Sequence, residues 1–276
     1  MSAVLSVEHL VVEYPTPSGV HRAVDDVSFT IERGSTLAVV GESGCGKSTI
    51  ARSLVRLIRP TSGSITLDGV DISALPENRL RPLRSKIQMV FQDPYGSLDP
   101  HMTAQEIVAE PLKLQGVRSK AERHKEAAKL IDQVGLPAKS LDRHPSEFSG
   151  GQRQRIGIAR ALASKPELLV CDEATSALDV SVQAQVLRLL KSIQDETGIT
   201  YVFISHNLGV VQEISDSVMV MQRGKLVESG STASVLTAPK EDYTRKLRRA
   251  ALDPSTMTGL KPRHLVRSLA LANQAN

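Results

Sequence analysis

The chain has 276 residues, 41% of them hydrophobic and 23% charged, with a formal net charge of +4. This composition is ordinary for a globular protein of one or two domains with a buried core. Its longest apolar runs, such as 168–171 and 201–204, fall far short of the roughly 20 residues that span a bilayer. The N-terminal residues lack the layout of a secretory signal, and two cysteines without metal-ligand spacing favour a reducing compartment without disulfides.

Short apolar runs alternate along the chain with amphipathic stretches, which predicts an α/β fold whose sheet is covered on both faces. The first ~35 residues and 64–67 are interpreted as strands of a small antiparallel layer. Buried parallel strands are predicted at 36–40, 87–91, 168–171, 201–204 and 218–221. Two helices are predicted from apolar faces with helical spacing. Their residues are Ile50, Leu54, Leu57 and Ile58, and then Val182, Val186, Leu189, Leu190 and Ile193.

The segment from about 93 to 155 has no strand signal and is predicted to be helical. Within it, Ser119 and Glu122 form a possible capping box for a charged helix that should end at Gly135. We therefore expect a helical subdomain inserted into the α/β core. The predicted division is a core of 1–92 and 156–237, a helical subdomain of 93–155, and a C-terminal extension of 238–276.

One segment fits the phosphate-loop pattern G-x-x-x-x-G-K-[ST] between a predicted strand and a predicted helix. Glycines let the backbone wrap around phosphates, so that N–H groups and the helix N-terminus face the anion. Lys47 is expected to reach the β- and γ-phosphates, and Ser48 to bind Mg²⁺. The predicted nucleotide-binding residues are Gly41, Glu42, Ser43, Gly44, Cys45, Gly46, Lys47, Ser48 and Thr49.

Two carboxylates, Asp172 and Glu173, follow the apolar run at 168–171. They are expected at the carboxyl edge of the sheet, where open α/β sheets bind ligands. Asp172 is predicted to hold Mg²⁺. Glu173 is predicted to orient and deprotonate an attacking water, the role of a general base.

The sequence Phe148-Ser149-Gly150-Gly151-Gln152 resembles the signature motif of ABC ATPases, usually written L-S-G-G-Q. Small residues again open a predicted helix, whose N-terminus attracts an anion. The resemblance implies that Ser149, Gly150, Gly151 and Gln152 contact the γ-phosphate of the ATP held by a partner subunit. Phe148 replaces the common Leu, and its side chain is expected to pack in the interior.

Other motifs of the ABC family follow in the family's order. Gln92 resembles the Q-loop glutamine that touches Mg²⁺ or water, and His206 the switch histidine at the γ-phosphate. Tyr14 lies where the family places an aromatic ring against adenine. The D-loop of the dimer interface is represented by Ser176, Ala177, Leu178 and Asp179. The resemblance implies a phosphate-loop (RecA-like) ATPase core that uses ATP and Mg²⁺, with Glu173, His206 and Lys47 as catalytic residues.

Longer stretches, 91–103, 148–155 and 173–186, look like the dipeptide/oligopeptide importer branch, and specifically like the second (F-type) of its two ATPase subunits. This resemblance implies a related but distinct partner ATPase, two transmembrane permease subunits and an extracytoplasmic solute-binding protein. It also implies peripheral attachment at the cytoplasmic face of the inner membrane. A homodimer remains an alternative, as does import of nickel, opines or glutathione.

A non-transport ABC ATPase acting on DNA or ribosomes is a remote alternative. The segment 240–276 carries a net charge of +5, which could attract nucleic acid or anionic lipid, although a solvated tail is the simpler interpretation. Such ATPases usually contain a long coiled-coil insertion or two ATPase domains, and neither pattern is present, so no nucleic-acid partner is expected. Separately, Cys45 lies near Lys47 and a helix N-terminus, an environment that lowers the pKa of a thiol. We therefore predict that alkylation of Cys45 inhibits ATPase activity and that bound MgATP protects the thiol, with an inert small residue as the equal alternative.

Overall fold

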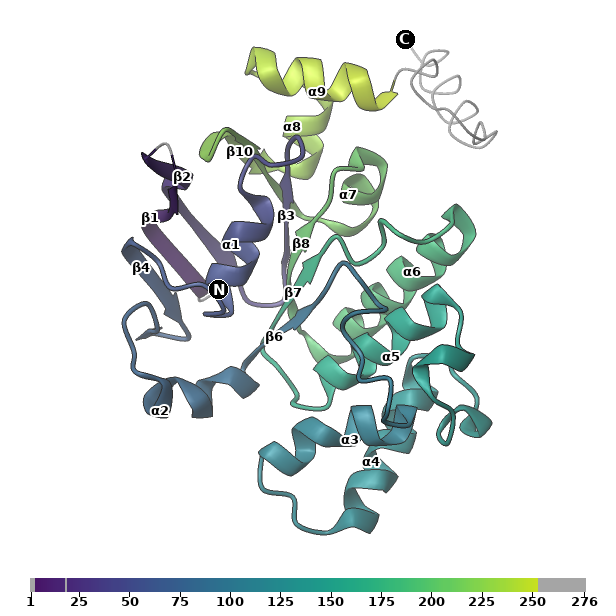
Figure 1. The fold of residues 1–276 in the computed structure, drawn as a ribbon. Coiled ribbons are helices and arrows are strands. Elements are labelled where there is room, and N and C mark those ends of the chain that lie inside the picture. Colours follow the sequence, from purple (N-terminus) through teal and green to yellow (C-terminus); the bar gives the residue numbers. More distant parts are fainter. Residues whose placement is uncertain (1–2, 18, 253–276) are drawn as a thin grey trace.

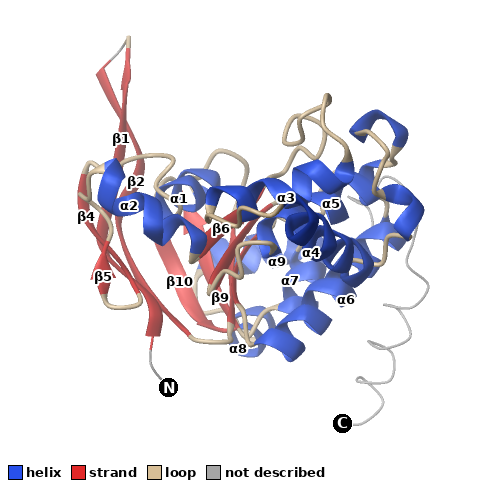
Figure 2. Ribbon diagram, turned by 90° about the horizontal axis from the view of Figure 1, so that it is seen from below, coloured by secondary structure: helices blue, strands red, loops and turns tan. Residues whose placement is uncertain are grey.

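The computed structural model describes residues 3–17 and 19–252, which form two sheets and a set of helices (Figures 1 and 2). The smaller sheet is antiparallel, with four strands in the order β2-β1-β4-β5. Its strands are β1 (Ala3–Thr16), β2 (Gly19–Glu32), β4 (Ser62–Leu67) and β5 (Val70–Asp71). The predicted antiparallel layer is confirmed.

The larger sheet has six strands in the order β10-β9-β3-β8-β7-β6. Neighbouring strands from β9 to β6 in this order run parallel, and β10 pairs antiparallel with β9 at one edge. Each of the five predicted strands is confirmed to within one residue at either end. The strands are β3 (Thr36–Val40), β6 (Ile87–Val90), β7 (Leu168–Asp172), β8 (Thr200–Ile204), β9 (Ser217–Gln222) and β10 (Lys225–Ser231).

Both faces of the parallel sheet are buried, as the continuous apolar runs predicted. Successive side chains of β8 belong to different hydrophobic cores. Tyr201 and Phe203 pack in the core that includes α5 (Gly150–Leu162) and α6 (Val180–Thr197). Val202 and Ile204 pack in the core shared with α1 (Lys47–Leu54) and the antiparallel sheet. The expected α/β fold with an antiparallel layer is therefore confirmed.

Between β6 and β7 the chain forms helices, short 3₁₀ turns and loops, as predicted. The helices are α3 (Ala104–Leu114), α4 (Lys120–Gln133) and α5, and α3 and α4 lie together away from the antiparallel sheet (Figure 1). Ser119 caps α4 by accepting from the Glu122 N–H at 3.3 Å, and Gly135 follows the helix at φ +71°. A separate helical subdomain remains a prediction, and α5 is continuous across the proposed boundary at 155–156.

The first predicted helix is shorter than its apolar spacing indicated. Helix α1 ends at Leu54, and Arg56 adopts a left-handed conformation at φ +55°. The Arg56 guanidinium donates to the carbonyls of Ile72 and Leu75 at 2.7 and 3.1 Å, which holds the chain in this turn. Leu57, predicted on the buried helical face, is 56% exposed, so that part of the prediction is wrong.

The remaining helices are short, apart from the last. They are α2 (Glu77–Leu80), the 3₁₀ helices Arg81–Ser85, Ala138–Ser140 and Pro145–Glu147, α7 (Leu208–Ile214), α8 (Thr232–Thr237) and α9 (Asp242–Leu252). Within the described ranges, no helix has both the length and the apolar character needed to cross a membrane. Residues 253–276, most of the predicted basic tail, lie outside the described residues.

Replacing Phe203 by Ala should destabilise the fold strongly, because its ring is fully buried between the central sheet and the helices. Large-to-small changes of this kind cost about 3–5 kcal/mol. Urea unfolding of the variant measures the loss. The control Val20→Ala, at a side chain that is 67% exposed, should stay within about 0.5 kcal/mol of the parent. Equal losses in both variants would contradict the placement of this core.

Candidate functional site

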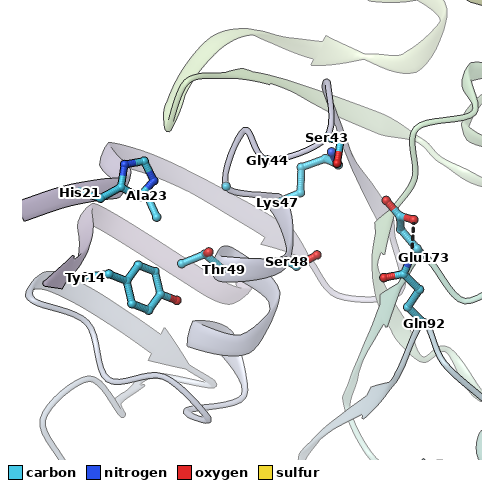
Figure 3. A pocket seen from close by; sticks show the side chains of 11 residues that line it. Tyr14, His21, Ala23, Ser43, Gly44, Lys47, Ser48, Thr49, Gln92 and Glu173 are labelled. Atoms are coloured by element: carbon cyan, nitrogen blue, oxygen red, sulfur yellow. Dashed lines mark hydrogen bonds between the residues drawn. The ribbon is translucent and has the colours of Figure 1, made fainter. Parts of the chain in front are cut away.

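The carboxyl ends of four parallel strands meet at one edge of the larger sheet. The segment 41–49 follows β3, Gln92 lies just beyond β6, Glu173 follows β7, and His206 follows β8. A cleft of about 310 Å³ opens there. Its lining residues are Tyr14, His21, Ala23, Ser43, Gly44, Gly46, Lys47, Ser48, Thr49, Gln92 and Glu173 (Figure 3).

The loop after β3 wraps around the Lys47 ammonium group. Lys47 is buried and donates from Nζ to the carbonyl oxygens of Gly41 and Glu42, both at 2.8 Å. Helix α1 begins at Lys47, with Gly46 as its N-cap residue at φ +107°. Unpaired N–H groups and the positive end of the helix dipole therefore meet the cleft. This arrangement is suited to a phosphate group.

Two glycines of this loop are required by close backbone packing. A Cβ atom on Gly41 would lie 2.3 Å from the Met221 carbonyl oxygen at the end of β9. A Cβ atom on Gly46 would lie 2.3 Å from the Ala23 carbonyl oxygen in β2. Both positions also have positive φ angles, which glycine adopts without steric cost. The loop is therefore held between the two sheets.

Ser48 and Asp172 bring two oxygen ligands together beneath the loop. The Ser48 hydroxyl donates to Asp172 Oδ1 at 2.9 Å. Burial raises the pKa of the Asp172 carboxyl and outweighs the charges of Arg52 and Lys47, so its ionised form is penalised. Among the described residues no cluster of three or more His, Cys, Asp or Glu side chains is arranged for a metal. The pair instead fits Mg²⁺, which keeps waters and phosphate oxygens as its other ligands.

Two other predicted site residues, Gln92 and His206, approach the Glu173 carboxylate. Gln92 Nε2 donates to its Oε2 at 2.9 Å (Figure 3), and His206 Nδ1 lies 3.4 Å from its Oε1. The backbone of Glu173 has a φ of +47°, an uncommon value for a side-chain-bearing residue and one often found at functional sites. The Glu173 side chain is 16% exposed and that of His206 60%. Asn207, next in the chain, caps α7 by accepting from the Gly209 N–H at 2.9 Å.

The aromatic residue Tyr14 lies at the opposite end of the cleft from Gln92 and Glu173 (Figure 3). It pairs directly with His21 across the β1–β2 hairpin. His21 and Ala23 also line the cleft, and the motif-based reading of the sequence missed both. Only the strand register reveals them, because it sets His21 opposite Tyr14.

Several predicted residues contact the lining rather than form it. Gly41 and Glu42 bind Lys47, Asp172 accepts from Ser48, and His206 faces Glu173. Cys45 Sγ lies 3.9 Å from Lys47 Nζ. Contrary to our expectation, the pKa of the Cys45 thiol is raised rather than lowered, because burial outweighs the effect of the lysine. A thiol that is 6% exposed is poorly suited to alkylation.

The signature segment lies outside the cleft. Ser149 and Gln152 form a capping box at the start of α5, in which each side chain bonds to the other's backbone N–H. Phe148 packs in the core as expected, with the Arg143 guanidinium 4.7 Å from its ring centroid. None of residues 149–152 is among the described residues that line the cleft.

The predicted D-loop, Ser176 to Asp179, lies between Glu173 and the start of α6. The Ser176 hydroxyl donates to the Glu173 carbonyl oxygen at 3.0 Å. Asp179 caps α6 by accepting from the Val182 N–H at 2.9 Å. Gly151 packs so closely against Val182 that a Cβ atom on it would lie 2.3 Å from Val182 Cγ1. Helix α6, which follows the D-loop, therefore packs against the signature helix within one chain.

Helix α5 also bonds to the chain on both sides of Gln92. Gln154 Nε2 donates to the Phe91 carbonyl oxygen at 3.5 Å, and Arg160 Nη1 donates to the Ser97 carbonyl oxygen at 2.6 Å. The Arg153 guanidinium lies 3.9 Å from the centroid of the Tyr95 ring. A movement of α5 would therefore displace Gln92 as well.

Solved structures with the same architecture include two of MJ0796, described as a bacterial ABC transporter cassette. Their TM-scores are 0.76 and 0.77 at 30% identity, and each alignment covers 83% of this chain and 98% of that one. Both are dimeric, and one is in a post-hydrolysis state bound to ADP and Pi.

Relatives by sequence carry names from the same family. A Sinorhizobium fredii protein named as a peptide ABC transporter ATP-binding protein is 52% identical over 91% of this chain and 73% of its own length. The oligopeptide transport ATP-binding protein OppF of Bacillus subtilis is 48% identical over 88% of this chain and 80% of its own length. Residues 24–176 match the family model described as ABC transporter. The chain therefore belongs to the ABC transporter family and is one of its ATP-hydrolysing, ATP-binding cassettes.

Proposed function

We propose that this chain is the ATP-hydrolysing subunit of an importer for dipeptides or oligopeptides, and that its cleft holds MgATP. The observation that carries the catalytic part is the convergence of Gln92 and His206 on the Glu173 carboxylate, at one end of a cleft lined by the phosphate loop. The peptide part is supported by the names of two relatives, a probable peptide ABC transporter ATP-binding protein and an oligopeptide transport ATP-binding protein.

In this proposal the nucleotide lies along the cleft. Adenine stacks on Tyr14, beside His21, and the phosphates lie against the N-terminus of α1. Lys47 exchanges its bonds to the Gly41 and Glu42 carbonyls for bonds to β- and γ-phosphate oxygens.

Ser48 and Asp172, with Gln92 nearby, would hold Mg²⁺. When bound, the ion would neutralise charge that develops on the phosphate oxygens. The buried Asp172 carboxylate fits this role, because burial raises its pKa despite the Ser48 hydrogen bond and the nearby Arg52 and Lys47 charges.

Glu173 acts as the general base. It orients a water whose oxygen forms a bond to the γ-phosphorus while the bond to the β,γ-bridging oxygen breaks, and it accepts the water proton. ADP and phosphate are the products. His206 and Lys47 stabilise the transferring group, and the amide of Gln92 holds the Glu173 carboxylate in place.

A second ATPase subunit completes the site in this proposal. Residues 149–152 start a capped helix outside the chain's own cleft, so they are free to meet the γ-phosphate held by the partner. We propose a related, distinct ATPase as that partner, with two permease subunits and an extracytoplasmic binding protein, at the cytoplasmic face of the inner membrane. Closure of the pair would move α5 and, through Gln154 and Arg160, the chain on both sides of Gln92.

Capture of the tagged Glu173→Gln chain with MgATP from gently solubilised membranes tests the assembly. Recovery of two membrane subunits and a second ATPase is the expected result. The associated binding protein is then screened by thermal shift against peptides, nickel, opines and glutathione, and stabilisation by peptides alone is expected. Recovery of ribosomes or DNA without membrane subunits would contradict the transport role.

Replacing Glu173 by Gln should leave MgATP binding intact and slow hydrolysis by about 10²–10⁴-fold, the usual contribution of a general base. Nucleotide binding is measured by calorimetry and turnover by phosphate release. Glu213→Gln, on an exposed position of α7, is the matched control and should keep parental turnover. A Glu173→Gln variant with near-normal turnover would remove this residue from its role.

Replacing Tyr14 by Ala should weaken ATP binding by about 5- to 150-fold, because stacking of a base on an aromatic ring contributes about 1–3 kcal/mol. Tyr14→Phe retains the ring and should bind like the parent. Triphosphate alone lacks a base, so its affinity should be the same for all three proteins. If Tyr14→Ala binds ATP normally, the adenine lies elsewhere.

Replacing Asp172 by Asn should stabilise the nucleotide-free protein while abolishing the gain in ATP affinity that Mg²⁺ produces. Because burial raises the Asp172 pKa, its ionised form destabilises the fold at neutral pH, and protonation removes this penalty as the pH falls. Thermal melting should show a rise of about 2–4 °C for each kcal/mol gained, shrinking in acid. Asp132→Asn, at an exposed position of α4, should show neither effect. An unchanged melting temperature at neutral pH would contradict the penalty.

A further inference from the structure

Helix α9, although far from the motifs in sequence, reaches the phosphate loop. The backbone N–H of Glu42 donates to the hydroxyl oxygen of Tyr243 at 3.2 Å. In Figure 1, α9 lies across the end of the molecule at which β3 leads into α1. The motif-based roles described above leave this tyrosine without a function.

The bond from Tyr243 acts on the same peptide unit that holds Lys47. The Gly41–Glu42 peptide accepts from Lys47 Nζ at the Gly41 oxygen and donates to Tyr243 through the Glu42 N–H. Because a peptide unit is planar, fixing its N–H fixes the direction of its carbonyl. Gly41, at φ +152°, offers little resistance of its own to rotation of this unit. The Tyr243 hydroxyl therefore keeps the Gly41 oxygen turned towards Lys47.

Tyr243 is itself well anchored. Its ring packs with Leu236 and Leu247 against the small core that contains Val40, the last residue of β3. The start of α9 is fastened to β10, because the Glu228 carboxylate accepts from the N–H groups of Lys240 and Glu241 at 2.9 and 3.2 Å.

The phenol keeps its proton at neutral pH. Burial, with the nearby Glu42 carboxylate, raises the pKa of Tyr243. A neutral hydroxyl can accept the Glu42 N–H and still donate its own proton. Because the Tyr243 ring is packed in the core and its hydroxyl is neutral, its bond to the Gly41–Glu42 peptide is a fixed contact between the C-terminal extension and the phosphate loop.

We propose that Tyr243 is a positioning residue of the phosphate loop, whose hydroxyl holds the Gly41–Glu42 peptide in the conformation that is ready for nucleotide. This inference rests on the proposed role of the loop in binding MgATP. The contact lowers the conformational cost of binding, since a loop ordered in advance need not be ordered by the ligand. The C-terminal extension thereby acts on the ATP site as well as covering the sheet edge.

Tyr243→Phe tests the inference, because it removes the hydroxyl and keeps the ring in its core. Loss of one neutral hydrogen bond should weaken MgATP binding by about 2- to 10-fold, measured by calorimetry on the intact chain. KM for ATP should rise by a similar factor while kcat stays near the parental value, because Tyr243 touches none of the reacting atoms. Lys246→Ala, exposed on the same helix, should match the parent.

Amide hydrogen exchange gives a readout independent of activity. Without nucleotide, the Glu42 N–H should exchange faster in Tyr243→Phe than in the parent, while the melting temperature changes little. A variant that melts lower but keeps parental affinity and Glu42 protection would show a merely structural role and overturn the inference. If the parent chain itself fails to bind MgATP, the proposed function fails; if only the variant comparison shows no difference, this inference alone fails.

Discussion

The parallel pairing of β3 with β8, of β8 with β7, and of β7 with β6 is the constraint on which the site depends. Parallel strands end at the same edge, so residues separated by up to 165 positions, Gly41 and His206, are brought to one place. Such pairing is stable only when both faces of the sheet are covered. The two hydrophobic cores on either side of β7 and β8 provide that cover, and they hold the strand ends that carry Lys47, Asp172 and Glu173.

The site contains two buried charged side chains whose hydrogen-bond partners are neutral groups. Lys47 and Asp172 are both buried, yet in this structure Lys47 is satisfied by loop carbonyls and Asp172 by a single hydroxyl. Neutral partners offset desolvation less well than an opposite charge. A polyphosphate with its metal ion would bring further opposite charge to both groups, which would favour binding.

Helix α5 and the C-terminal extension connect this edge to the rest of the molecule in different ways. Helix α5 carries the capped signature segment at one end and bonds to the chain on both sides of Gln92 through Gln154 and Arg160. It therefore links the surface proposed to meet a partner with the Glu173 carboxylate, which Gln92 contacts. Helix α9 instead contacts the phosphate loop directly, through Tyr243. The contacts of α5 are suited to transmit movement to Gln92, whereas the contact of α9 is suited to hold the phosphate loop in one conformation.

The sequence by itself determined the parallel strands, the phosphate loop and the family, because buried strands are continuous apolar runs and the chemistry of phosphate binding needs glycines and a lysine at set spacing. It also identified Gln92 and His206, which converge on Glu173, through their resemblance to the Q-loop glutamine and the switch histidine of ABC ATPases. Only the tertiary structure decided features set by contacts distant in sequence. The length of α1 depends on carbonyls near residue 72, and the raised pKa of Cys45 on burial against the core. His21 enters the cleft through strand register, and Tyr243 meets Glu42 across 201 positions of chain. No local pattern encodes such contacts, because they arise from how separately predictable elements pack together.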